Sequence, residues 1–176
     1  MRVLISGGPG SGCTSTARAI GERLGLPAFD SDSYFHKPTD PPFQEQYSPE
    51  ERRTLLGSAL SVEPNWILCG SVATWGLDSL EPTHGVLLSP PKEVRLERLL
   101  NRQRNHFGSR IDPGGEMGGE HQSFMEWAAG YEERTDFGRN LETDRAFLEA
   151  HCEHLATLVE NEAMEEIVLK VISFLA

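Results

Sequence analysis

Short apolar runs separate longer stretches of helical spacing along the chain. The apolar runs predict strands at five places: 2–6, 27–29, 66–69, 85–88 and 154–159. The stretches between and after them predict helices over 14–24, 49–61, 92–105, 122–134, 141–151 and 163–175. Strands that alternate with helices are typical of a parallel sheet covered on both faces. We therefore expect a three-layer α/β fold with a parallel sheet of about five strands.

Turn and capping residues mark the ends of several elements. Ser48 opens the second helix with the capping-box sequence SPEE. Three prolines in 37–43 predict a loop, and four glycines and a proline in 110–119 predict another. No internal repeat or linker interrupts the pattern, so we expect one domain over 1–176, with a closing lid at about 105–121.

Charge and composition narrow the class of protein. The formal net charge is −11, and residues 113–176 hold 14 acidic and 4 basic side chains, which is −10 of that total. An acidic body repels polyanions, so nucleic acid is not an expected partner. The chain has no run of 18 apolar residues and no signal-peptide core, so we expect no membrane association and a cytoplasmic protein. Three widely spaced cysteines predict reduced thiols, and the histidines share no metal-ligand spacing beyond His151 and His154.

The sequence GGPGSGCT, residues 7–14, lies between a predicted strand and a predicted helix. This is the context of a P-loop, in which glycines turn the backbone tightly so that its N–H groups and the helix N-terminus face phosphate oxygens. The residues expected to contact a nucleotide are Gly8, Gly10, Ser11, Gly12, Cys13, Thr14 and Ser15. Thr14 stands where a hydroxyl would bind Mg²⁺, so the expected cofactors are ATP, or another nucleoside triphosphate, and Mg²⁺. A glycine-rich turn without a ligand is the alternative.

Cys13 departs from the P-loop pattern, which has a lysine at this position. That lysine offsets phosphate charge during transfer, so its loss removes an electrostatic contact but leaves the backbone cradle. A reactive thiol at the helix N-terminus is a further alternative for Cys13.

Several segments resemble one family over nearly the whole chain. They are GSGCTS, FDSDSYF, TDPPF, WILCGS, RIDPGGEM and HQSFMEWAAGY. The chain resembles P-loop kinases of the adenylate kinase, shikimate kinase and gluconate kinase branch. It is most similar to uncharacterised bacterial proteins labelled adenylate-kinase-like or ATPase. The resemblance implies that relatives also lack the P-loop lysine.

The resemblance also implies roles for acidic residues after the second strand. Asp32 is the first candidate for substrate contact or general base, and Asp30 is the second, with Tyr34 beside them. A solvated helix-capping cluster is the alternative, because DSDS is also common at helix starts. Trp75 follows the strand that ends at WILCGS and is a candidate wall of the substrate pocket. Ser71 stands where a Walker-B aspartate would be, which weakens the case for ordinary ATP hydrolysis.

Arginines gather in the predicted helix 92–105, where Arg95, Arg98 and Arg102 share one face. In the resembled kinases a lid brings arginines to the phosphates, which implies catalytic roles for Arg102 and Arg110. An exposed face laced with ion pairs is the alternative.

Together these features predict an ATP-dependent phosphotransferase that acts on a small molecule or nucleotide. Two alternatives stay open: a nucleotide-binding sensor without catalysis, and a nucleoside triphosphate hydrolase. The acceptor and the preferred base are not identified by the sequence.

Overall fold

The computed structural model describes every residue of the chain except Pro41, Asp78 and Glu160. The strands are β1 (Arg2–Gly7), β2 (Ala28–Asp30), β3 (Trp66–Cys69), β4 (His84–Leu88) and β5 (His154–Leu158). The helices are α1 (Cys13–Leu24), α2 (Asp32–Phe35), α3 (Pro49–Ser61), α4 (Lys92–Phe107), the 3₁₀ turn η1 (Gly108–Ile111), α5 (Gly118–Ala129), α6 (Leu141–His151) and α7 (Met164–Leu175).

All five strands form one parallel sheet in the order β2-β3-β1-β4-β5. Strand β1 is central, with Ile5 opposite Cys69 on β3 and opposite Val86 on β4. The chain leaves β1 toward one side of the sheet and later crosses to the other side to form β4. Ligands of open α/β sheets bind at such a switch point, at the carboxyl ends of the strands.

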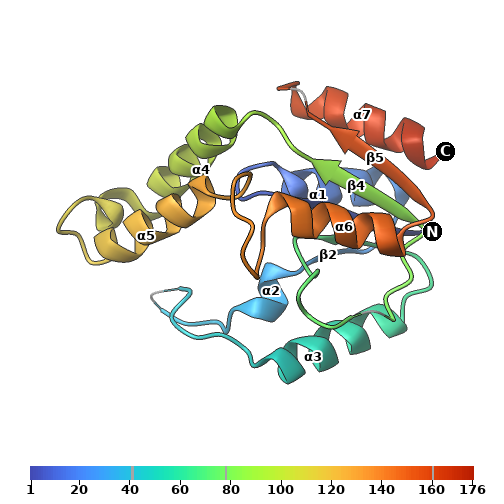
Figure 1. Cartoon of the computed structure of the whole chain (residues 1–176), viewed down its shortest axis with the longest axis horizontal. Coiled ribbons are helices and arrows are strands. Elements are labelled where there is room, and N and C mark those ends of the chain that lie inside the picture. Colours follow the sequence, from blue (N-terminus) through green and yellow to red (C-terminus); the bar gives the residue numbers. More distant parts are fainter. Residues whose placement is uncertain (41, 78, 160) are drawn as a thin grey trace.

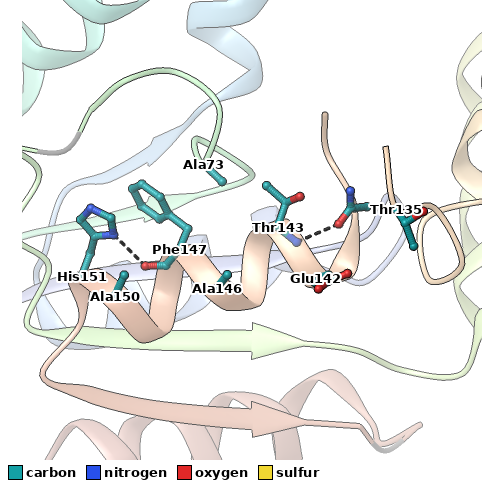
Figure 2. A pocket seen from close by; sticks show the side chains of 9 residues that line it. Ala73, Thr135, Glu142, Thr143, Ala146, Phe147, Ala150 and His151 are labelled. Atoms are coloured by element: carbon teal, nitrogen blue, oxygen red, sulfur yellow. Dashed lines mark hydrogen bonds between the residues drawn. The ribbon is translucent and has the colours of Figure 1, made fainter. Parts of the chain in front are cut away.

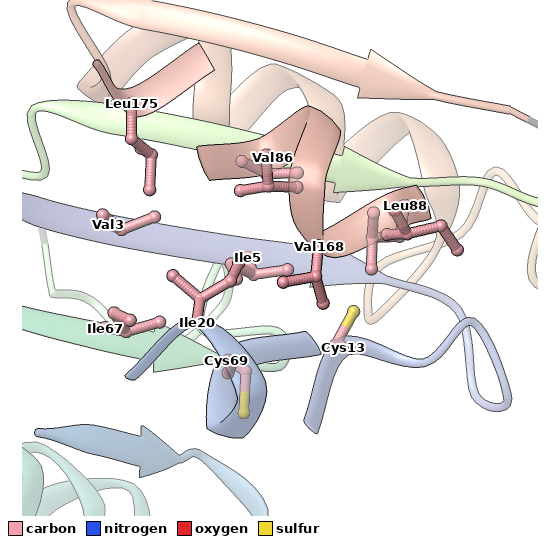
Figure 3. Packing of buried hydrophobic residues seen from close by; sticks show 13 residues of the cluster. Val3, Ile5, Cys13, Ile20, Ile67, Cys69, Val86, Leu88, Val168 and Leu175 are labelled. Carbon is pink, nitrogen blue, oxygen red and sulfur yellow. The ribbon is translucent and has the colours of Figure 1, made fainter. Parts of the chain in front are cut away.

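Helices cover both faces of the sheet (Figure 1). Val3 and Ile5 pack on one face with residues of α1 and α7, including Ile20 and Val168 (Figure 3). Leu4 points to the other face, where it joins a cluster with residues of α3 and α6. This alternation is expected of strands buried on both sides, and it confirms the predicted three-layer fold.

Most predicted elements are present. The capping box at Ser48 forms, because its side chain accepts from the Glu51 amide and the Glu51 carboxylate accepts from the Ser48 amide. The predicted loop 37–43 and the TDPPF segment include Pro41, which lies outside the described residues. The bounds 122–134 predicted for the fourth helix are wrong, because the corresponding helix α5 begins at Gly118 and ends at Ala129. The sequence pattern also did not predict the short helix α2.

Helix α4, η1 and α5 form an arm that projects beyond the sheet (Figure 1). We call residues 92–129 the α4–α5 arm. A small apolar cluster of Phe107, Ile111 and Met117 packs at its tip. Among the residues that the structure describes, none of the helices combines the length and apolar character needed to cross a membrane.

Candidate active site

The glycine-rich loop joins the central strand β1 to helix α1. Gly10 and Gly12 have backbone φ angles of +86° and +96°, which residues with a Cβ rarely adopt. Gly10 also packs closely on α4, so that a Cβ there would lie 2.2 Å from the carbonyl oxygen of Arg95. Glycine is therefore required at position 10 for two separate reasons.

Helix α1 begins at the end of this loop without a side-chain cap on its N-cap residue, Gly12. The first N–H groups of a helix lack helical partners and carry the positive end of the helix dipole. The loop and the helix start together suit an anion. Ser11 is buried and Ser15 is exposed on α1. The nucleotide contacts predicted from the sequence stay predictions.

The side chain of Cys13 lies in the hydrophobic core and not in the position of a phosphate-binding cation. It packs in the cluster that contains Leu88 and Val168 (Figure 3), and its sulfur lies 3.2 Å from the Ser11 hydroxyl oxygen. Burial raises the pKa of the Cys13 thiol to about 11. The residue therefore supplies neither a positive charge nor a thiolate at neutral pH.

We expect Cys13 to resist alkylation in the folded protein. With a pKa of about 11, about one thiol in a thousand is ionised at pH 8, and the thiolate is the reactive form. Burial also raises the pKa of Cys152 to about 11, so it should react slowly too. Labelling with iodoacetamide, followed by peptide mass mapping, checks this, with guanidinium-unfolded protein as the control. Rapid labelling of folded Cys13 would instead favour the reactive-thiol alternative.

Three residues predicted for the site converge beside α1. The Thr14 hydroxyl donates to Asp30 Oδ2 at 2.8 Å, and the Asp32 amide donates to Asp30 Oδ1 at 3.0 Å. Strand β2 ends at Asp30, and the next amide, of Ser31, donates to the Cys69 carbonyl at the end of β3. The strand ends thus bring a hydroxyl and two acidic residues to the rim of the glycine-rich loop.

An aromatic wall follows Asp32. Tyr34 and Trp75 belong to the same hydrophobic cluster, and Trp75 is buried. The Arg52 guanidinium lies 3.7 Å from the Phe35 ring centroid and 5.9 Å from that of Trp75. The exposed Asp32 therefore lies at the start of α2, and Phe35 at the far end of this short helix contacts the guanidinium of Arg52, which comes from α3.

The two arginines predicted to be catalytic lie on the α4–α5 arm, away from the loop. Arg110 Nε donates to Glu116 at 3.0 Å, and Arg102 is exposed on α4. In the part of the chain that the structure describes, neither one hydrogen-bonds to the glycine-rich loop. Their action on phosphates stays a prediction.

Two other arginines contact the loop directly. Arg95 is fully buried, and its Nη1 donates to the Pro9 carbonyl at 2.7 Å. Arg139 Nη2 donates to the Gly7 carbonyl at 2.8 Å. Arg139 was not predicted as a site residue from the sequence. The sequence offered one signal for it: Arg139 lies between a glycine and Asn140, at the start of α6. The Asn140 side chain caps this helix by accepting from the Thr143 amide.

A buried carboxylate near the end of β3 was also missed. Asp144 on α6 accepts from the Ser71 hydroxyl at 2.5 Å and from the Tyr131 hydroxyl at 2.7 Å. Burial raises the pKa of Asp144, and the charge of Arg139 opposes that effect. The position after WILCG has no Walker-B aspartate. It holds Ser71, whose hydroxyl donates to Asp144 of helix α6.

Two shallow grooves lie outside the loop. One of about 520 Å³ runs along α6 between Ala73 and Phe147 (Figure 2). The other, of about 600 Å³, runs along α4, and five residues line it: Arg98, Asn101, Arg102, Asn105 and His106. Across the described residues, no three His, Cys, Asp or Glu side chains form a group that could hold a metal ion by themselves.

Comparison with known proteins gives one clear relative. No family model matches the chain. Uncharacterized protein YqaC of Bacillus subtilis (strain 168) is 33% identical over 130 residues, which are 73% of this chain and 71% of that protein. The chain belongs to the YqaC family. Because YqaC is itself described as uncharacterized, membership of the YqaC family identifies a relative but no reaction.

Solved structures similar to this YqaC-family chain include small-molecule kinases. A shikimate kinase from Bacteroides thetaiotaomicron has a TM-score of 0.55 at 22% identity, covering 99% of this chain and 98% of that one. A gluconokinase from Sinorhizobium meliloti 1021 has a TM-score of 0.56 at 15% identity, covering 99% and 90%. A sugar kinase from Janibacter sp. HTCC2649 has a TM-score of 0.53 at 18% identity, covering 98% and 92%. At these identities the likeness establishes the P-loop kinase fold and no more.

Proposed function

We propose that this YqaC-family protein is a phosphotransferase that binds ATP, or another nucleoside triphosphate, with Mg²⁺ at the glycine-rich loop. The observation that carries the proposal is the 2.8 Å hydrogen bond between Thr14 and Asp30, beside the uncapped start of α1. It puts a hydroxyl and a carboxylate next to a position suited to phosphate. The kinases with a similar fold act on small molecules by name, which supports a small-molecule acceptor.

Thr14 and Asp30 are the residues that would hold Mg²⁺. Their oxygens are the hard ligands that this ion prefers, and Mg²⁺ commonly takes only one or two protein ligands while keeping several waters. Bound there, the ion would supply positive charge to the phosphate oxygens. The backbone N–H groups of the loop would hold those oxygens from the other side.

The acceptor would bind beside Asp32. Its hydroxyl oxygen would form a bond to the γ-phosphorus while the bond to the β–γ bridging oxygen breaks, and Asp32 would accept the hydroxyl proton. Tyr34 and Trp75 would line the acceptor pocket, and Arg52 offers it a positive charge. Asp32 is exposed, so an incoming hydroxyl can reach it.

The α4–α5 arm would serve as the lid. The groove along α4 is close to the β5–α7 connection, because Arg98 Nη2 donates to Asn161 at 2.8 Å. Met164, after that connection, accepts from the Thr16 hydroxyl at 3.6 Å. We assign this groove to the nucleotide base. Arg102 and Arg110 would be the arginines of this lid, and they would reach the phosphates when the arm closes.

The buried Cys13 favours a second candidate function. A protein that senses a nucleotide without turning it over needs the cradle but not the lysine. A Cys13→Lys variant separates the two: a large gain in turnover would indicate a decayed active site and favour the sensor.

Calorimetric titration of ATP and GTP, with and without Mg²⁺, tests the proposal. We expect Mg²⁺ to strengthen binding. Thr14→Ala should weaken the Mg²⁺-dependent binding about tenfold or more, the scale of a hydrogen bond to a charged group. Thr54→Ala, at an exposed threonine of α3, is the matched control and should bind like the native protein. Absence of binding to either nucleotide at millimolar concentration would contradict the proposed function.

A further inference from the structure

Arg139 occupies the mouth of the glycine-rich loop although it lies far away in the sequence. Its Nη2 donates to the carbonyl of Gly7, the first glycine of the loop, 132 residues earlier in the chain. The segment that carries it is tied down on both sides. The Asn140 side chain donates to the Asp136 carbonyl at 3.0 Å, and the Leu141 amide donates to the Tyr131 carbonyl at 3.0 Å. The guanidinium is therefore held in place by its surroundings.

This guanidinium also has an unused donor. Arg139 Nε is buried and has no hydrogen-bond partner among the described residues. A buried N–H group without an acceptor is costly, and in native proteins such a group often marks a functional position. Arg139 thus combines a charge fixed at the loop with a buried donor that lacks an acceptor.

A buried hydrogen-bond network lies beside the segment that carries Arg139, which it meets at the bond from the Leu141 amide to the Tyr131 carbonyl. Asp144 is 1% exposed and binds Ser71 and Tyr131 with its two carboxylate oxygens. The Tyr131 ring packs on the loop itself, since a Cβ on Gly8 would lie 2.6 Å from Tyr131 Cδ1. The positive charge of Arg139 acts to lower the pKa of both Asp144 and Cys13. The guanidinium therefore lies close enough to the loop and to the Asp144 carboxylate to interact with them electrostatically.

The other residues that could supply a positive charge at the loop lack this combination. Arg95 is fully buried, and its donors are occupied by Glu132, Pro9 and Ala128. Arg110 is paired with Glu116. Cys13, at the lysine position, is turned into the core.

We propose that Arg139 supplies the positive charge that Cys13 does not, and binds the terminal phosphate oxygens of the nucleotide at the glycine-rich loop. This inference rests on the proposed function. A guanidinium binds phosphate oxygens through two parallel N–H groups, so an arginine from the segment before α6 can replace a lysine from α1 without moving the backbone cradle.

The test uses the full chain with two probes, ATP with Mg²⁺ and inorganic tripolyphosphate, which keeps the phosphates and lacks the base. Arg139→Gln should weaken both by about 10- to 100-fold, and Arg139→Lys should weaken both by less. Adding Cys13→Lys to Arg139→Gln should restore much of the affinity, because lysine is costly to bury in the core and is the residue that reaches the phosphates from this position in the P-loop pattern. Arg145→Gln, at an exposed arginine of α6, is the control and should leave both affinities unchanged.

The possible outcomes separate the two proposals. If the native protein binds both probes and Arg139→Gln binds them equally well, the inference is wrong and the proposed function stands. If the native protein binds only tripolyphosphate, and Arg139→Gln loses it, Arg139 is a phosphate ligand but the nucleotide function is wrong. Binding of neither probe overturns both. Should Arg139→Gln fail to fold, as circular dichroism would reveal, Arg139→Met decides, because it keeps the apolar stem of the side chain and removes the charge: affinity equal to native for both probes overturns the inference.

Discussion

Replacing Arg95 with methionine is expected to lower the free energy of unfolding by about 3–5 kcal/mol, the range for removing one partner of a buried ion pair. Arg95 is fully buried and forms a two-pronged ion pair with Glu132, with N···O distances of 2.8 and 2.7 Å. It also donates to the carbonyls of Pro9 and Ala128. Methionine fills similar space but leaves the half-buried Glu132 carboxylate and the Pro9 carbonyl without the donors that Arg95 supplies.

Chemical denaturation followed by circular dichroism measures this loss. For a chain of this size the melting temperature should fall by roughly 6–20 °C. Arg104→Met, at an exposed arginine of the same helix, is the control and should stay within about 0.5 kcal/mol of the native protein. Adding Glu132→Leu should recover part of the loss, because the orphaned carboxylate is then removed. Equal stability of the Arg95 and Arg104 variants would show that Arg95 has no structural role.

The contrast between Arg95 and its neighbours shows what periodicity can and cannot predict. The sequence places Arg95, Arg98 and Arg102 on one face of α4, and the helix confirms that spacing. Periodicity gives the direction of a side chain but not what packs against it. Arg95 is buried because residues 128–132 and the glycine-rich loop cover it, whereas Arg102, two turns further along, is exposed.

Local signals explain why the fold was largely predictable. The runs RVLIS, WILC and GVLL are continuous and apolar because β1, β3 and β4 are buried on both faces. The start of α5 was missed because Gly118 and Gly119 indicate a loop. The chain nevertheless turns helical there, since the Met117 amide donates to the Arg110 carbonyl and the Gly118 amide to that of Gly115.

The residues of the candidate site also fall into two groups, those that the sequence could identify and those that it could not. Residues in or directly after a strand end, such as Thr14, Asp30 and Asp32, could be named from the sequence because the fold brings strand ends together. Arg139 and Asp144 could not, because they reach the loop and Ser71 from α6 and the segment before it. The contact of Arg139 with the loop joins residues 132 positions apart, and that of Asp144 with Ser71 joins residues 73 positions apart. Contacts at such separations produce no periodic pattern in the local sequence.

The second large effect concerns Asp32. Under the proposed function we expect Asp32→Asn to lower kcat about 10²- to 10⁴-fold, the usual contribution of a general base. Asparagine has the same shape and keeps the backbone bond from residue 32 to Asp30, but it cannot accept the proton of the acceptor hydroxyl. Nucleotide affinity should therefore be unchanged, whereas Asp30→Asn should weaken the Mg²⁺-dependent part of binding.

Transfer of radiolabelled γ-phosphate from ATP to a panel of small hydroxylated acceptors measures the effect, with release of phosphate to water recorded in parallel. Glu149→Gln, at an exposed carboxylate of α6, controls for the loss of one negative charge. The parallel record separates the proposed kinase from a hydrolase. In a kinase, Asp32→Asn lowers phosphorylation of the acceptor, because the base for the acceptor hydroxyl is lost. Slow release of phosphate to water does not depend on that base. If phosphate is released to water only, and Asp32→Asn leaves that release undiminished, the site is instead assigned to nucleotide hydrolysis. Asp32 is then only an acidic residue in the first turn of α2.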